Sequence, residues 1–284
     1  MSIEGSSKAA TARVNGVSPA TVGRWTERAA QFAGRFFGET VRDVEATEIQ
    51  ADELRGYSGS KKRREFVFAA VEVSSRLWLA QRVGGRTKRN CRLLVRETRH
   101  RCALGRRRIL ITTDPFKYYA PEVRKSWGPA CVHVESGKLI RGGRIVRVRN
   151  TLVHGVRWQL DEVLERCVGT EKPNTAYIER LNLTIRRALA ALHRRTNNAA
   201  RSRRKLGEAV TLLQCYYNFV RPHSSLRIGG VKRTPAWQAE LVKRRLTWRD
   251  VFMAFRPVAR LSWLANPDAR AAWGRRWACA GSNS

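Results

Sequence analysis

Acidic residues are scarce in this chain of 284 residues. It carries 23 Asp and Glu against 56 Lys and Arg, which gives a formal net charge of +33 at pH 7. The basic residues are spread along most of the sequence and are not confined to one tail. A positive field of this size attracts polyanions, and nucleic acid is the most common one. We therefore expect a nucleic-acid partner.

Paired cysteines and long apolar runs are also absent. The six cysteines are widely separated and contain no C-x-x-C pair, which argues against a zinc ribbon. No run approaches the length of a membrane span, and the first residues lack the apolar core of a signal peptide. No amphipathic anchor or lipidation motif is visible. These absences predict a soluble protein of the cytoplasm, associated with the nucleoid and without a membrane partner.

The hydrophobic fraction of 43% is ordinary for a globular protein, so a packed core is expected. Three strand-like segments separated by turns predict an antiparallel meander over residues 48–57, 65–73 and 76–84. Strands ending at Asp114 and covering 130–135 then alternate with helices over 87–102 and 115–126, which predicts an α/β fold with a mixed sheet flanked by helices. The remainder is expected to be mainly helical, over 158–168, 175–196, 203–220 and 235–246.

Two basic strand-like segments meet at Gly142-Gly143, within residues 138–150. The glycine pair predicts a hairpin whose arginines alternate on one face. A solvated edge ribbon is the alternative, and the sequence leaves both open.

The first 42 residues contain signals for a short helical module. Asn15-Gly16 predicts a turn, and Ser18 followed by Pro19 predicts the start of a helix over about residues 20–32. Arg24 and Arg28 would then share one face. This layout is typical of a partial helix-turn-helix, whose second helix enters the major groove of DNA. An ordinary surface helical hairpin fits the segment equally well.

One carboxylate stands out in the arginine-rich stretch "YIERLNLTIRR". An apolar stripe of the predicted helix consists of Ile178, Leu181, Ile185, Leu189 and Leu192, and should face the sheet. Glu179, Asn182 and Arg186 fall together on the flank of that stripe. Glu179 is therefore expected at the border of the core, where it can point into a cleft, and Asn182 could position Glu179 or DNA.

Two further carboxylates occupy positions that need an explanation. Asp114 ends a short apolar strand, and strand ends in α/β sheets open onto crevices. Asp52 lies inside the first strand, where Asp is disfavoured. Each acid alone reads as a surface or capping residue, but carboxylates that converge from different elements bind hard cations such as Mg²⁺. Glu53 points to the opposite face of the strand, so we expect it to have a structural or solvent-facing role.

Three segments carry a family resemblance. "DELRGYSGSKKRREFVFAAVEVSSRLW", "ITTDPFKYY" and "NTAYIERLNLTIRRALAALHRRT" resemble, in this order, the signature blocks of DDE transposases related to the first-described insertion-sequence family. "YYNFVRPHSSL" and "RTPAWQA" resemble the C-terminal blocks of the same proteins. The resemblance implies an RNase H-like catalytic domain over about residues 45–255. We expect the partial helix-turn-helix to occupy residues 1–42, and the tail 256–284, which has no clear period, is left without a predicted structure.

The resemblance also implies a catalytic site. Asp52, Asp114 and Glu179 would bind two Mg²⁺ or Mn²⁺ ions and catalyse cleavage and strand transfer of an insertion sequence, and Arg186 would contact DNA. The expected partners are transposon ends and target DNA, bound by a homodimer or a higher synaptic complex. Pro115 departs from the family, which often has Gly at that position.

A charge run that includes Arg194 and Arg195 is either a solvated face or a track for DNA phosphates, and we favour the track. His193 reads as a surface residue and His223 as a helix-end cap. Two rival functions remain. One is a non-catalytic DNA-binding protein, or a decayed transposase remnant with a shortened N-terminus. The other is a basic RNA-binding structural protein.

Overall fold

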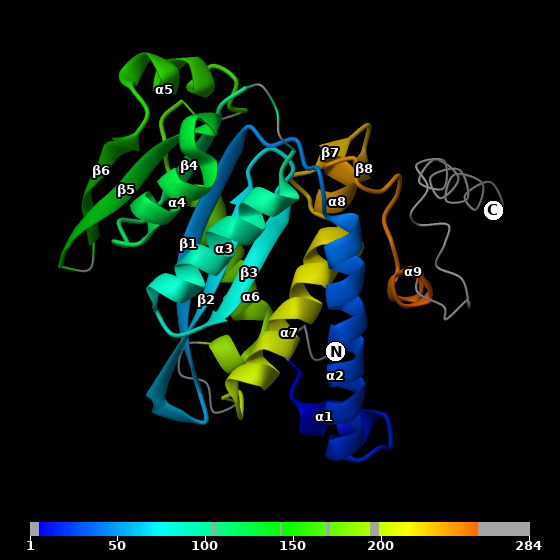
Figure 1. Ribbon diagram of the computed structural model, residues 1–284. Coiled ribbons are helices and arrows are strands. Elements are labelled where there is room, and N and C mark those ends of the chain that lie inside the picture. The colour runs from blue at the N-terminus through cyan, green and yellow to red at the C-terminus, as the bar shows by residue number, and fades with distance from the viewer. Residues whose placement is uncertain are drawn as a thin grey trace.

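The protein is built on one mixed sheet of six strands, in the order β3-β2-β1-β4-β5-β6 (Figure 1). The computed structural model describes residues 6–103, 105, 107–142, 144–168, 171–193 and 199–254. The strands of this sheet are β1 (Glu48–Ser58), β2 (Ser60–Glu72), β3 (Trp78–Gly84), β4 (Ile109–Thr113), β5 (Cys131–Arg141) and β6 (Arg144–His154). A separate two-stranded sheet pairs β7 (Arg227–Ile228) with β8 (Val231–Lys232). Strands β1 to β3 pair antiparallel, β4 and β5 run parallel to β1, and β6 returns antiparallel to β5. The predicted α/β fold and the meander are confirmed.

Helices cover both faces of this sheet. The helices are α1 (Lys8–Val14), α2 (Pro19–Thr40), α3 (Lys88–Arg101), α4 (Tyr119–Trp127), α5 (Arg157–Leu164), α6 (Ala176–Ala188), α7 (Arg203–Cys215), α8 (Pro235–Gln238) and α9 (Trp248–Met253). Figure 1 shows α3 in front of the sheet and α6 behind it, with α7 and α2 side by side at the β3 edge. Every residue of β4 is buried, as expected for a short parallel strand covered on both faces.

Helix α2 begins where the sequence predicts but ends later than predicted. The Ser18 side chain accepts a hydrogen bond from the backbone N of Thr21, and Pro19 takes the first helical position of α2, as predicted. The helix runs to Thr40, beyond the predicted end near residue 32. Its second half continues because Phe36 and Phe37 are buried in the main core, where both pack edge-on against Phe219. The helix-turn-helix interpretation of this hairpin stays a prediction.

The predicted helix over 175–196 is shorter than expected. It ends at Ala188, and Leu192 reaches the core from a following 3-10 turn (Ala190–Leu192). Leu192 packs against β1 at Gly56, where only a residue without a side chain leaves enough room, because a Cβ atom at this position would lie 2.5 Å from Leu192 Cδ2. The helix breaks so that Leu192 can fill the space above a residue without a side chain.

Two other predictions have clear outcomes. The hairpin over 138–150 is confirmed, since β5 and β6 pair up to Arg141 and Arg144. The edge-ribbon alternative describes the same segment, because β6 is the last strand of the sheet and residues 146–150 are exposed. The helix predicted over 235–246 is wrong in length, because α8 is a single turn and the chain adopts a left-handed conformation at Glu240 (φ 58°). The tail 256–284 lies outside the described residues.

Candidate functional site

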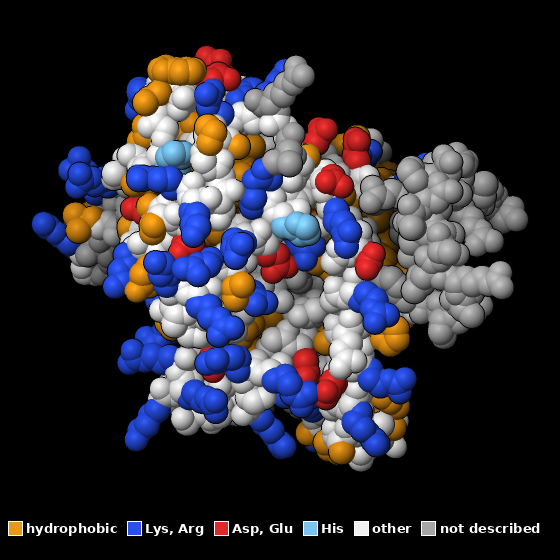
Figure 2. Space-filling model, in the orientation of Figure 1, with side chains coloured by type: hydrophobic (Ala, Val, Ile, Leu, Met, Phe, Trp, Pro, Cys, Tyr) orange, Lys and Arg blue, Asp and Glu red, His pale blue; other side chains and the backbone are white. Residues whose placement is uncertain are grey.

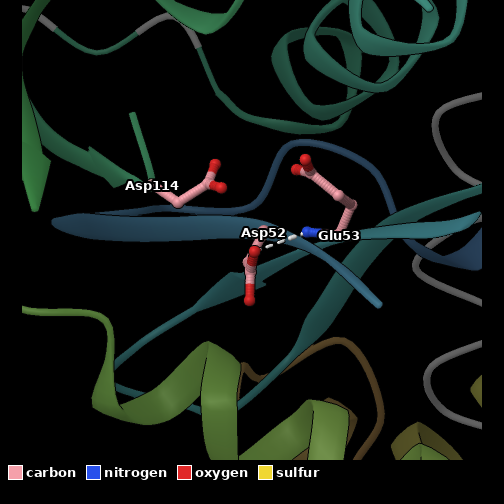
Figure 3. Close-up of side chains that lie close together, drawn as sticks. All are labelled: Asp52, Glu53 and Asp114. Atoms are coloured by element: carbon pink, nitrogen blue, oxygen red, sulfur yellow. Dashed lines mark hydrogen bonds between the residues drawn. The ribbon is translucent and has the colours of Figure 1, made fainter. Parts of the chain in front are cut away.

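Asp52 and Asp114 lie side by side at the point where β4 ends. Ala51 of β1 pairs in parallel with Thr113, the last residue of β4, so the two aspartates are the next residues on neighbouring strands. Asp52, Glu53 and Asp114 each offer a carboxylate oxygen within 4.8 Å of the others. Figure 3 shows Glu53 and Asp114 directing their carboxylates to one side of β1, whereas Asp52 points to the other side, towards α6. We call these three residues the acidic cluster.

Asp52 is fixed by two hydrogen bonds. Its Oδ2 accepts from Asn182 Nδ2 of α6 at 2.9 Å, and its Oδ1 accepts from the backbone N of Glu53 at 2.7 Å. Burial raises the pKa of Asp52, and the negative charge of Glu179 raises it further, whereas the two hydrogen bonds act in the opposite direction. This carboxylate is therefore held in one orientation in surroundings that favour an added cation.

Asp114 and Glu53 share one cation, Arg86. The Arg86 guanidinium forms an ion pair with Glu53 and lies 3.5 Å from Asp114 Oδ2. Burial raises the pKa of Asp114 to about 8, and the negative charges of Glu53 and Asp52 contribute to the shift. Burial also raises the pKa of Glu53. One exposed arginine does not compensate three neighbouring carboxylates, so the acidic cluster attracts positive charge.

Glu179 lies outside the acidic cluster. It sits in the first turn of α6, where it forms an ion pair with Lys138 of β5 and accepts a hydrogen bond from Thr175 Oγ1 at 2.6 Å. Its side chain is 44% exposed, and its charge acts on Asp52. Of the three predicted site residues, the structure thus brings Asp52 and Asp114 together, with Glu179 nearby but bound to a lysine.

Glu53 is a member of the acidic cluster, although the sequence predicted a structural or solvent-facing role for it. Its side chain does point away from that of Asp52, as the strand alternation predicts (Figure 3). Asp114, however, follows the end of β4 and turns its carboxylate towards Glu53. The adjacent pair Asp52-Glu53 was the available signal, but alternation alone could not show where Asp114 would point.

A buried glutamine that the sequence did not single out anchors α6. Gln50 Oε1 accepts from the backbone N atoms of Tyr177 at 2.9 Å and Ile178 at 3.1 Å. Thr175, the N-cap residue, makes no side-chain capping bond, so Gln50 caps the helix from the neighbouring strand. Gln50 and Asp52 lie two residues apart on β1, and both bond to α6. These bonds hold the first turn of α6, which carries Glu179, against β1.

The predicted DNA-contacting residues of α6 are less exposed than expected. Asn182 is 7% exposed and is bound to Asp52, so it positions that carboxylate. Arg186 is half-buried, and its Nη1 donates to the backbone O of Leu192 at 3.4 Å. Arg186 therefore contacts the chain just after the helix break.

The other predicted contacts lie at the surface or outside the described part. Arg24 and Arg28 are exposed on α2, on either side of Glu27, which pairs with Arg204 and Lys205 of α7. Arg194 and Arg195 lie outside the described residues. Figure 2 shows Lys and Arg side chains over most of the visible face, with Asp and Glu more sparse among them.

The acidic cluster has the chemistry that a hard divalent cation requires. Glu53 Oε2 and Asp114 Oδ1 are buried and make no hydrogen bond of regular geometry among the described residues, although the Tyr119 side chain and the backbone of Phe116 are close enough to lower the pKa of Glu53 and Asp114, respectively. Carboxylate oxygens of this kind are the ligands that Mg²⁺ and Mn²⁺ prefer. Asp52, Glu53 and Asp114 could hold one such ion, and Glu179 could add a ligand if it left Lys138.

Comparisons with known proteins leave the family open. No protein-family model matches the sequence, and no curated protein matches it significantly. The resemblance to DDE transposases therefore stays a prediction from the sequence motifs. Within the described residues, no helix combines the length and apolar character that crossing a bilayer requires.

Proposed function

We propose that this chain is a DDE-type DNA transposase that cuts DNA phosphodiester bonds and joins the freed 3′ hydroxyl to target DNA. The observation that carries the proposal is the pairing of Asp52 and Asp114 on neighbouring parallel strands, with Glu179 of α6 close enough to act on Asp52. The order of the mixed sheet is compatible with an RNase H-like catalytic domain, and the net charge of +33 suits a DNA partner.

In this proposal, residues of the chain bind the metal, orient the Asp52 side chain and neutralise the charge of the DNA phosphates. Asp52 and Asp114 would hold the metal, with Asn182 keeping Asp52 in place, and Glu179 would complete the ligand set after leaving Lys138. A pair of bound Mg²⁺ or Mn²⁺ ions would activate the attacking water or hydroxyl and stabilise the leaving oxygen of an in-line displacement. Basic side chains around the site would bind the phosphates on either side of the cut.

Two cations would have to release the carboxylates. Arg86 has a side chain that is 45% exposed, and Lys138 one that is 29% exposed, so both can withdraw towards solvent. Their present ion pairs compensate part of the negative charge of Glu53, Asp114 and Glu179 without a metal. The same pairs favour the alternative function, a non-catalytic DNA-binding protein, because a basic chain can keep such carboxylates for structure alone.

Metal-dependent nicking tests the proposal. The purified chain would be incubated with supercoiled DNA, with and without Mg²⁺ or Mn²⁺. Asp52→Asn, Asp114→Asn and Glu179→Gln should each bind DNA at least as well as the parent, because each replaces a carboxyl group by a neutral amide and none adds negative charge, yet lose nicking by at least about a hundredfold. Glu162→Gln is the matched control, since Glu162 is 46% exposed and ion-paired on α5.

The results separate the candidates. A parent chain that binds DNA but never nicks it with either metal would favour the non-catalytic alternative. Nicking that survives Glu179→Gln but is lost in Glu53→Gln would transfer the third ligand position from α6 to β1.

A further inference from the structure

A second site lies on the outer side of α6. A cavity of about 730 Å³ opens between this helix, the turn joining β2 to β3, the π-helical turn Tyr216–Val220 and the segment that follows it. The volume lies within the range of small-molecule sites, which is roughly 300–1,000 Å³. Neither the acidic cluster nor Glu179 lines it. This site is therefore separate from the one on β1.

The cavity wall is strongly cationic. No Asp or Glu is among the lining residues, whereas five positive side chains are: Arg76, Arg180, Arg187, Arg221 and Lys232. In the part of the chain that the structure describes, none of the five forms an ion pair. Other basic residues, such as Arg204 and Lys205, pair with carboxylates. Uncompensated like charges around one cavity repel each other, and a bound anion relieves that repulsion.

One of these arginines is held in place before any ligand binds. Arg76 adopts a left-handed backbone conformation (φ 62°), which is uncommon for a residue with a side chain. Its Nη1 donates to the backbone O of Val73 at 2.6 Å, and its guanidinium lies 3.8 Å from the centroid of the Tyr177 ring. Such strained positions cluster at ligand-binding sites, where the surroundings hold them. The fixed guanidinium is suited to binding the oxygens of a phosphate.

Aromatic side chains stand beside the cations. Tyr177, Tyr216 and Tyr217 line the cavity, and Tyr216 stacks on Trp248 with an interplanar angle of 9°. His223 also lines it, and burial lowers the pKa of His223 to about 4, so it is neutral at pH 7 and adds no charge. Flat rings next to arginines are the combination that binds nucleotides, because bases stack on rings and phosphates pair with guanidinium groups.

We propose that this cavity binds a nucleoside phosphate, with the phosphate held by Arg76, Arg180 and Arg187 and the base resting against the tyrosines. The ligand is either a free nucleotide or one unit of a nucleic-acid strand, since both present the same base and phosphate. The site does not depend on the proposed cleavage reaction.

Calorimetric titration of the full chain at about 150 mM salt tests this, where long-range attraction is largely screened. The probes are inorganic phosphate, thymidine monophosphate and a short single-stranded oligothymidylate. The nucleotide should bind more tightly than phosphate. Arg180→Gln with Arg187→Gln should weaken nucleotide binding by at least about tenfold, because two charged contacts are lost. Arg89→Gln with Arg124→Gln removes the same charge from exposed sites on α3 and α4 and should change it by less than about twofold.

Further variants keep the test decisive. Lys232→Gln changes an exposed strand residue and should weaken binding even if the double variant folds poorly. Tyr216→Leu, which leaves the contact between Arg76 and Tyr177 in place, should weaken nucleotide binding but not phosphate binding. Much tighter binding of the oligothymidylate than of the nucleotide would identify a strand as the ligand, and equal binding a free nucleotide. Equal affinity for phosphate and nucleotide, equal losses in the two double variants, or no binding of any probe would overturn the proposal.

Discussion

The Nδ2 atom of Asn182 donates a hydrogen bond of 2.9 Å to Oδ2 of Asp52, joining α6 to a strand 130 positions earlier in the chain. This bond connects α6, which carries Glu179, to β1, which carries Asp52 and Glu53 of the acidic cluster. It is the only side-chain hydrogen bond to Asp52 among the described residues, since its other partner is the backbone of Glu53.

Removing this donor should destabilise the fold. Asn182→Ala leaves a buried carboxylate oxygen without its partner, which costs about 1–3 kcal/mol. Urea denaturation of the variant and the parent measures the difference in unfolding free energy. A loss below about 0.5 kcal/mol would mean that water replaces the amide at Asp52.

Gln50 should matter more, because it serves two backbone N–H groups. In Gln50→Ala the N–H groups of Tyr177 and Ile178 lose their acceptor, and we expect a loss of about 2–4 kcal/mol. Gln31→Ala, at an exposed position of α2, is the control and should stay within about 0.5 kcal/mol of the parent. Equal stability of the two variants would contradict the capping role.

Replacing glycine by alanine should have opposite effects on stability at Gly56 and at Gly38, because only Gly56 is in close contact with another side chain. Gly56→Ala places a Cβ atom 2.5 Å from Leu192 Cδ2 and should destabilise the protein by about 1–3 kcal/mol. Gly38→Ala, in α2, meets nothing within 4 Å and should stabilise it by about 0.5–1 kcal/mol. Adding Leu192→Ala to Gly56→Ala should relieve the clash, which a double-mutant cycle would detect as coupling between the two sites.

Acid should destabilise the chain through two histidines, of which His133 is buried and His223 is half-buried. Burial lowers the pKa of His133 to about 3 and that of His223 to about 4. An unfolded histidine titrates near 6.5, so the unfolded state takes up protons that the folded state refuses. Stability is therefore lost as the pH falls through 6.5, by about 2 kcal/mol per histidine between pH 7 and pH 5. Urea denaturation should show a flatter pH dependence in His133→Gln, and the same slope as the parent would disprove the role of this histidine.

Binding to non-specific DNA should depend steeply on salt. Lysines and arginines displace counterions from DNA, and a contact with 6–10 phosphates loses about 10³–10⁵ in affinity between 50 and 200 mM salt. The charge of +33 motivates this expectation. Fluorescence anisotropy with a random duplex measures it, and a flat response would remove the electrostatic basis of DNA binding.

Much of the fold could be predicted from local patterns. Turn residues and alternation located the strands, and Ser18-Pro19 located the start of α2. The end of α2, the break before Leu192 and the length of α8 could not be predicted, because tertiary contacts or a single left-handed residue decide them. The convergence of Asp52 and Asp114 was expected from the family resemblance, and only Asp114 stands at a strand end. The ion pair of Glu179 with Lys138 was not, since it depends on how β5 lies beside α6.

The parallel pairing of β1 with β4 also bears on when the site forms. Ala51 and Thr113 are brought together only after the meander and α3 have been made, and Asn182 arrives later still. Contacts so distant in sequence form slowly, because the intervening chain must be ordered first. During synthesis, a ribosome-bound chain that stops before α6 has no Asn182 to hold Asp52 and no Glu179 beside it. Its basic residues, by contrast, are spread along most of the sequence, so a nascent chain carries an excess of positive charge before its carboxylates are assembled.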